Sequence, residues 1–164
     1  MLITVLNPNT SWDMTGSIER SARAVAGPDT VVRAVCPAMG PASIESHYDE
    51  ALAVPGLLAE IARGEQLGSD GYVIACFGDP GLDAARELAA GPVVGIAEAA
   101  MHAASFLGRG FSVVTTLSQP MAPEISNTLP CEIANDEIEP TFWLPSPSSS
   151  VLRTFSAGAV ASAT

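Results

Sequence analysis

The sequence is poor in basic residues and has no long apolar run. Seven Lys and Arg residues stand against 18 Asp and Glu, which gives a formal net charge of −11. Nucleic acids attract basic surfaces, so this balance argues against a nucleic-acid partner. No apolar stretch approaches the length of a membrane span, and the N-terminus lacks a basic-then-apolar signal pattern. We therefore expect no membrane segment.

Aromatic residues and cysteines are scarce as well. Aromatic residues make up 5% of the chain and hydrophobic residues 48%, so any core must consist mostly of Ala, Val, Leu and Ile. The three cysteines, Cys36, Cys76 and Cys131, form neither a CxxC pair nor an even disulfide set. This pattern favours the reducing cytoplasm. A length of 164 residues allows one domain, or one domain with a small extension.

Short apolar runs rich in β-formers alternate with helical patterns over the first 117 residues. The expected strands cover 2–6, 30–36, 72–75, 92–96 and 111–116, and the expected helices 14–25, 49–63, 82–89 and 98–107. Such alternation with short joints predicts an α/β fold, with a parallel sheet flanked by helices and right-handed crossovers. Pro55 is expected to begin a second helical segment, and Gly64 to end it.

The composition changes after Leu117. Residues 118–164 are rich in Ser and Pro and carry no lasting amphipathic period. We therefore predict two parts: residues 1–117 as an α/β lobe plus one further strand, and 118–164 as a weakly ordered tail.

The segment around Cys76 is the main candidate site. The buried strand Tyr72–Ala75 runs directly into Cys76, and a glycine-rich turn that includes Gly78 follows. Asp79 is a possible cap for a helix that begins near Leu82. Open α/β sheets bind ligands at the carboxyl ends of their strands, and a helix start there would lower the pKa of a thiol. The alternative is that Cys76 is only a small buried hydrophobe.

Two other polar segments follow the ends of expected strands. Asn7 and Asn9 belong to the turn NPNTS, in which Thr10 or Ser11 is a plausible helix N-cap. This turn either surrounds a small polar ligand beside the thiol or only joins a strand to a helix. His47 lies in a long expected loop, 37–48, where it is either an acid–base group or a structural residue.

These segments together resemble the Asp/Glu/hydantoin racemase superfamily, and within it the hydantoin and allantoin racemase branch. The matching segments are NPNTS with Met14 and Thr15 behind it, GPASIESHYDEALAVPGLL, CFGDPGLDAAREL, PVVGIAEAAMHAA and FSVVTT. They occur in family order from residue 2 to about residue 117, and it is their combination that makes the resemblance specific.

The resemblance implies a cofactor-independent, metal-free racemase in the cytoplasm, with a hydantoin-like small molecule held between two similar α/β lobes. One cysteine removes the proton at the stereocentre and a second cysteine, on the opposite face, returns one. Cys76 matches the first of these, and a homo-oligomer is expected. The expected substrate-binding residues are Asn7, Asn9, Gly78, Asp79, Thr115 and Thr116. Glu98 and His102, spaced i, i+4, are expected to form a structural pair.

The chain departs from the family at the second cysteine. In the family, that cysteine lies in a Gly-rich segment after another buried strand, whereas Cys131 lies in LPCEIANDE, with no expected strand before it. We therefore expect most of the second lobe to be missing or replaced, as in a truncated or frame-shifted product, and racemisation to be impaired. Two alternatives stay open: a non-catalytic ligand-binding or assembly remnant, and one-cysteine chemistry such as decarboxylation.

Overall fold

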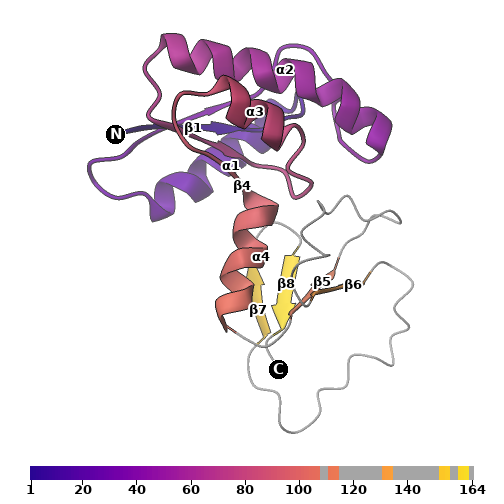
Figure 1. Ribbon diagram of the computed structural model, residues 1–164. Coiled ribbons are helices and arrows are strands. Elements are labelled where there is room, and N and C mark those ends of the chain that lie inside the picture. Colours follow the sequence, from indigo (N-terminus) through magenta and orange to yellow (C-terminus); the bar gives the residue numbers. More distant parts are fainter. Residues whose placement is uncertain (108–110, 115–130, 135–151, 156–158, 163–164) are drawn as a thin grey trace, which may run out of the picture. The chain divides into compact units, whose positions relative to one another are not determined.

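The computed structural model describes residues 1–107, 111–114, 131–134, 152–155 and 159–162 (Figure 1). The chain divides into two compact units, Met1–Ile96 and Ala97–Thr164. The boundary predicted at residue 117 lies outside the described residues and stays a prediction. No helix within the described ranges is long and apolar enough to cross a membrane.

The first unit is a four-stranded parallel sheet with helices on its two faces, which confirms the predicted fold class. Its strands lie in the order β2-β1-β3-β4, and all three neighbouring pairs are parallel. In chain order its elements are β1 (Leu2–Leu6), α1 (Trp12–Val25), β2 (Val31–Val35), α2 (His47–Gln66), β3 (Gly71–Ile74), α3 (Leu82–Leu88) and β4 (Val93–Gly95).

The core lies between one face of this sheet and the pair α2 and α3. In a parallel ladder, residues in register point to the same face, so Leu6, Val35 and Ile74 share a face. The buried cluster on this face is Leu6, Val35, Leu57, Ile61, Tyr72, Ile74, Ala85 and Val93. Figure 1 shows α1 on the other side of the sheet, where it contacts β1 and β2. Covering both faces explains why β1 is an unbroken apolar run.

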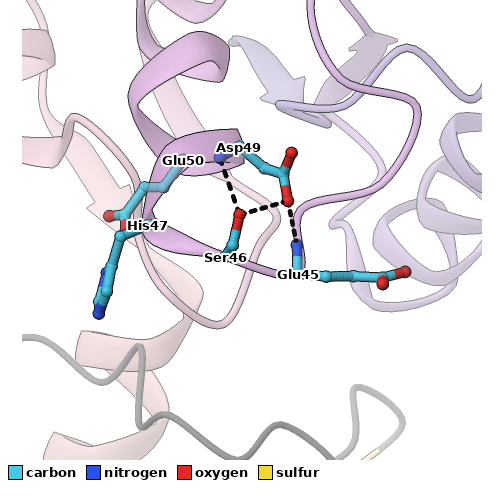
Figure 2. A network of polar contacts seen from close by, with 5 residues as sticks. All are labelled: Glu45, Ser46, His47, Asp49 and Glu50. Carbon is cyan, nitrogen blue, oxygen red and sulfur yellow. Dashed lines mark hydrogen bonds and ion pairs between the residues drawn. The ribbon is translucent and has the colours of Figure 1, made fainter.

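Serine side chains begin the first two helices. Ser11 is the N-cap of α1 and accepts a hydrogen bond from the Met14 N–H at 3.2 Å, so Ser11 rather than Thr10 has this role. Ser46 caps α2: its Oγ accepts from the Asp49 N–H at 3.2 Å and donates to the Asp49 carboxylate at 2.7 Å (Figure 2). This reciprocal arrangement fixes the start of α2, and it resembles a capping box in which Asp takes the place of Glu.

Three details of α2 differ from the sequence-based expectation. The helix begins at His47, so this residue is helical and not part of a loop. Pro55 lies inside one continuous helix, and Ala53 before it and Leu57 after it are both fully buried. Gly64 does not end the helix, which continues to Gln66. Instead it makes room for Tyr72, whose ring Cε1 atom would lie 2.6 Å from a Cβ at this position.

The second unit contains most of α4 (Ile96–Leu107) and two short sheets. β5 (Phe111–Val114) pairs in parallel with β6 (Cys131–Ala134), so β5 does not extend the first sheet. β7 (Leu152–Phe155) pairs antiparallel with β8 (Ala159–Ser162). The expectation of a weakly ordered tail at 118–164 falls mostly outside the described residues, but the structure has these three strands, β6 to β8, within that range.

Candidate active site

The carboxyl ends of β1 and β3 define the candidate site. β1 lies between β2 and β3, so the connection from β1 leads to one side and the next connection crosses to the other. Such a reversal of strand order is where open α/β sheets bind ligands. Asn7 follows β1 directly, and Cys76 follows β3 after one intervening residue. The Ala75 N–H donates to the Leu6 carbonyl at 2.8 Å, which keeps the two loops side by side where they leave the sheet.

The two described cysteines differ in accessibility. Cys36 follows β2 and is only 4% exposed, whereas Cys76 is partly exposed, and neither is in a disulfide. The two residues follow strands that β1 separates, and two strand spacings amount to about 9–10 Å. This separation is too wide for a disulfide without movement of the backbone. Cys76 is therefore the thiol that a small molecule can reach at this edge of the sheet.

The surroundings of Cys76 favour the neutral thiol. Burial raises the pKa of Cys76, a hydrogen bond from the Gly78 backbone N–H opposes this, and the charges of Asp79 and Glu50 raise it further. The prediction of a lowered pKa is therefore wrong. The helix expected to lower it, α3, has only seven residues and begins at Leu82, well along the chain from the thiol. Partial burial and the charges of two acids raise the pKa of Cys76 by more than this helix could lower it.

Asp79 occupies a different place from the predicted helix cap. Gly81 is the N-cap residue of α3, and no side chain caps this helix. Asp79 is 5% exposed and has a φ of 46°, a left-handed value that is costly for a residue with a side chain. Its carboxyl group lies against Gly95 at the end of β4, where any Cβ would overlap it. Asp79 thus joins the Cys76 loop to the neighbouring strand.

The two asparagines of the first loop form one buried network. Asn7 is 1% exposed, and its Nδ2 atom lies within hydrogen-bond distance of Asn9 Oδ1 (2.7 Å), Thr15 Oγ1 (3.0 Å) and the Ser11 carbonyl (3.1 Å). Its Oδ1 atom accepts from the Asn9 N–H at 3.3 Å. The polar atoms of the Asn7 side chain are therefore all used in hydrogen bonds to the loop and to the start of α1.

The Asn9 side chain makes strong hydrogen bonds through its Oδ1 atom but only a weak one through its Nδ2 atom. Its Oδ1 atom accepts from Asn7 and from the Ser11 N–H, at 2.7 and 2.9 Å. Its Nδ2 atom donates to the Met14 thioether at 3.2 Å, and sulfur is a weak acceptor. Within the described residues, Nδ2 makes no second hydrogen bond, and this makes Asn9 a better candidate for a binding residue than Asn7.

The remaining sequence-based candidates divide into three groups. Thr115 and Thr116 lie outside the described residues. Glu98 and His102 form the expected pair on α4, with Oε1 and Nε2 3.9 Å apart. Cys131 is the first residue of β6, so a strand follows it.

The sequence does not point to Glu50, since only the packing of α2 beside the Cys76 loop brings its charge to the thiol. Within the described ranges, no three His, Cys, Asp or Glu residues gather closely enough to hold a metal ion.

The fold and the site together define an α/β domain with a reachable thiol at the ligand-binding edge of a parallel sheet. The family model for Asp/Glu/Hydantoin racemase matches residues 3–130, and the chain belongs to this family. Over 117 residues the chain is 57% identical to the hydantoin racemase of Pseudomonas sp. (strain NS671). It is 54% identical over 117 residues to the hydantoin racemase of Rhizobium meliloti.

Solved structures agree with this assignment. An allantoin racemase from Klebsiella pneumoniae superimposes with a TM-score of 0.78 at 51% identity, over 82% of this chain and 58% of that chain. An allantoin racemase from Pseudomonas fluorescens gives a TM-score of 0.77 at 33% identity, over 85% of this chain and 62% of that chain. The matched region is 71% of this chain but 47% and 48% of the two hydantoin racemases, so the chain spans about half their length.

Proposed function

We propose that this chain provides the first lobe of a racemase for 5-substituted hydantoins or allantoin, with Cys76 as the base at one face of the stereocentre. One observation carries the proposal: a partly exposed thiol lies at the strand-order reversal of a lobe in the hydantoin racemase family. On the loop that follows the neighbouring strand β1, the Asn9 Nδ2 group donates only to the Met14 thioether, which is a weak acceptor.

The reaction suits these groups. The hydantoin stereocentre lies between a carbonyl carbon and an amide nitrogen, and the carbonyl makes its C–H a modest acid because the anion is an enolate. Removing it needs a base whose pKa is tuned to the substrate and donors for the oxygen that becomes an enolate. A thiol with a raised pKa is a stronger base once ionised, although less of it is ionised at neutral pH. In the proposal, the Asn9 Nδ2 group is a donor to the substrate, and Asn7 positions Asn9.

The other expected site residues keep supporting roles in the proposal. The Gly78 N–H stabilises the ionised sulfur through its hydrogen bond. Asp79 is a positioning residue that holds the Cys76 loop against β4. Thr115 and Thr116 are proposed to contact the substrate from the second lobe, which the family resemblance implies.

Racemisation also needs a proton donor on the opposite face, because a single base returns the proton to the side from which it was taken. Of the two further cysteines, Cys36 is buried, and the place of Cys131 at the start of β6 does not match the family's second cysteine. We therefore propose that these 164 residues exchange the proton with solvent but racemise slowly. A missing general acid typically costs about 10²–10⁴-fold in rate.

The proposal also covers the cofactor requirement, the compartment and the oligomeric state. The chemistry requires no cofactor and no metal, since the thiol and the amide donors are sufficient for proton transfer. The free thiols Cys36 and Cys76 are consistent with a reducing, cytoplasmic compartment. A homo-oligomer is part of the proposal, and sedimentation of the purified chain measures it.

The test follows isotope and configuration together. Each enantiomer of a 5-substituted hydantoin is incubated in D₂O with the protein, and mass and optical rotation are recorded over time against a protein-free blank. We expect deuterium to enter one enantiomer while rotation is kept. Cys76→Ala should abolish this exchange, and Cys36→Ala, at a buried thiol of the same lobe, should keep it.

Other results would change the proposal in defined ways. Rapid loss of rotation that Cys131→Ser abolishes would identify Cys131 as the second base. Exchange that survives in Cys76→Ala would overturn the role of Cys76. Absence of exchange, together with a hydantoin-dependent rise in Tm, would favour the non-catalytic alternative.

A further inference from the structure

Asn9, Ser11 and Met14 form a closed ring of hydrogen bonds in the loop that follows β1. The Ser11 N–H donates to Asn9 Oδ1 at 2.9 Å, and the Met14 N–H donates to Ser11 Oγ at 3.2 Å. The ring closes where Asn9 Nδ2 donates to Met14 Sδ at 3.2 Å. Two of the three acceptors are oxygen atoms, and the third is a thioether sulfur, which accepts only weakly. The contact between Asn9 and Met14 is therefore the weakest bond of the ring.

The same contact joins a buried amide to an accessible side chain. Asn9 is 6% exposed, whereas Met14 is 47% exposed. The Ser11 cap holds the backbone of Met14 in the first turn of α1, which keeps its side chain within reach of the Asn9 amide. A small oxidant in solution can thus reach Met14 and change the acceptor of this amide without unfolding the lobe.

We propose that Met14 is a modification site, at which oxidation to the sulfoxide by hydrogen peroxide turns the weak acceptor of the Asn9 amide into a strong one. A lone pair of the sulfur attacks one peroxide oxygen, and the S–O bond forms as the O–O bond breaks. The sulfur loses the two electrons that the peroxide gains, and the departing hydroxide takes the proton of the transferred oxygen and leaves as water. A polar sulfoxide then stands in place of an apolar thioether.

The sulfoxide oxygen competes with a ligand for Asn9 Nδ2. This step rests on the proposed function, in which that group is a donor to the substrate. An amide that its own chain engages is open to a ligand for only part of the time, and the apparent affinity falls by that fraction. One neutral hydrogen bond corresponds to about threefold to tenfold in such an equilibrium.

The first test observes the Asn9 amide itself. Protein labelled with ¹⁵N is treated with hydrogen peroxide and then with dithiothreitol, which reverses sulfenic acids and disulfides but leaves methionine sulfoxide in place. Peptide mass mapping identifies the oxidised methionines, and the loss of a side-chain amide signal in Asn9→Asp assigns that of Asn9. We expect this signal to move downfield when Met14 is oxidised, and to return after treatment with methionine sulfoxide reductase. Oxidation of Met14 without such a shift would overturn the proposal.

Two substitutions of Met14 separate acceptor strength from packing. Met14→Gln places an amide oxygen as many bonds from Cα as the sulfoxide oxygen, and it needs no oxidant, so the thiols stay intact. Met14→Leu keeps an apolar side chain but removes the acceptor. In the isotope-exchange assay, Met14→Gln should raise the hydantoin concentration that gives half the maximal rate by about threefold to tenfold, with an unchanged rate at saturation. Met14→Leu should leave this concentration at or below the parent value. An equal rise in both variants, or a loss confined to the saturated rate, would overturn the proposal.

The matched control is Met39→Leu. Met39 lies on the loop that follows β2 and is 83% exposed, so peroxide can reach it as well. After the same peroxide and dithiothreitol treatment, the half-maximal concentration should rise in Met39→Leu as in the parent protein and stay unchanged in Met14→Leu. A rise in treated Met14→Leu would assign the effect to another oxidised group, such as Cys76, and would overturn the proposal. If the Met14 variants do not fold, the Asn9 signal of the oxidised parent protein decides.

This inference and the proposed function fail in different ways. Absence of hydantoin-dependent exchange in the parent protein would overturn the proposed function, while the Asn9 signal still decides whether Met14 is the modification site. Exchange that depends on Cys76, with neither the Asn9 signal nor the half-maximal concentration changed by oxidation of Met14, would overturn this inference alone. A shifted signal with an unchanged half-maximal concentration would overturn the competition with substrate and the assignment of Asn9 as its donor.

Discussion

The Nδ2 atom of Asn7 lies 2.7 Å from the Oδ1 atom of Asn9. This bond gives two asparagines of one turn different tasks. Asn7 is 1% exposed and has all its side-chain polar atoms engaged within the loop, whereas Asn9 is 6% exposed and donates only to a thioether. In the loop that follows β1, the Asn7 amide therefore holds the turn together, and the proposal assigns ligand binding to the Asn9 amide.

Replacing each asparagine with aspartate separates these tasks. Asn7→Asp puts a carboxylate oxygen where Nδ2 meets three acceptors, so we expect the free energy of unfolding to fall by about 2–4 kcal/mol. Asn9→Asp keeps both bonds accepted by Oδ1 and loses only the thioether contact, so the loss should be smaller, about 1–2 kcal/mol. Urea denaturation measures both values.

For isotope exchange we expect the larger effect from Asn9→Asp, whereas for stability the larger effect comes from Asn7→Asp. Asn9→Asp should weaken hydantoin-dependent isotope exchange by at least about tenfold, because it removes a donor to the developing enolate oxygen. Equal stability losses in the two variants, or full exchange in Asn9→Asp, would show that the two amides are interchangeable and that Asn9 has no special role.

The sequence predicted the elements better than the contacts between them. The alternation of strands and helices gave the parallel α/β lobe and put Cys76 after β3, since both follow from local pattern. The commitment of Asn7 could not be predicted, because Thr15 and the Ser11 carbonyl reach its amide only after α1 has folded back on the strand end. The same holds for Glu50, whose effect on Cys76 depends on how α2 packs.

Two further sequence-based predictions were wrong for a similar reason. Gly64 has the residue type of a helix end, but its lack of a side chain serves the close approach of Tyr72. Asp79 has the residue type of a cap, but its carboxyl group is buried against Gly95. Residue preferences describe what a position allows locally, and here the tertiary neighbours decided its use.

The contact between Gly95 and Asp79 predicts a strong effect from one methyl group. Gly95→Ala would force its Cβ onto the carboxyl group, so the Cys76 loop or β4 must move. We expect a loss of about 1–3 kcal/mol in the free energy of unfolding, together with faster alkylation of Cys76 as the loop loosens. Gly27→Ala is the matched control, since nothing lies within 4 Å of a Cβ there. An unaltered alkylation rate in Gly95→Ala would mean that Asp79 does not hold the loop.

The cap of α2 predicts an acid-dependent contribution to stability. Hydrogen bonds from Ser46 and Glu45 lower the pKa of Asp49. A carboxyl group with a lowered folded-state pKa stabilises the protein above its unfolded-state pKa, near 3.9 for aspartate, and loses this effect as pH falls through the folded value. The expected window of loss is therefore about pH 4 and below.

Ser46→Ala tests this contribution. We expect it to lower the free energy of unfolding at neutral pH by about 1 kcal/mol and to flatten the decline below about pH 4. Ser21→Ala, at an exposed position within α1, should change stability by less than about 0.5 kcal/mol. If both variants lose the same stability with the same acid dependence, the pairing of Ser46 and Asp49 makes no specific contribution.

The thiol itself gives the last prediction, on selectivity and on alkaline stability. Because Cys76 is partly exposed and Cys36 is 4% exposed, N-ethylmaleimide should label Cys76 first in the native protein, by about tenfold or more. The raised pKa means that the folded protein holds its thiol proton at pH values where the unfolded chain has released it. The unfolded state then binds fewer protons, so stability should fall as pH rises above about 8.5, the unfolded thiol value. Urea titrations at successive pH values measure this decline, and Cys76→Ala should reduce its slope while Cys36→Ala should not. Preferential labelling of Cys36, or an alkaline decline that persists unchanged in Cys76→Ala, would show that Cys76 is not the reachable, desolvated thiol of this lobe.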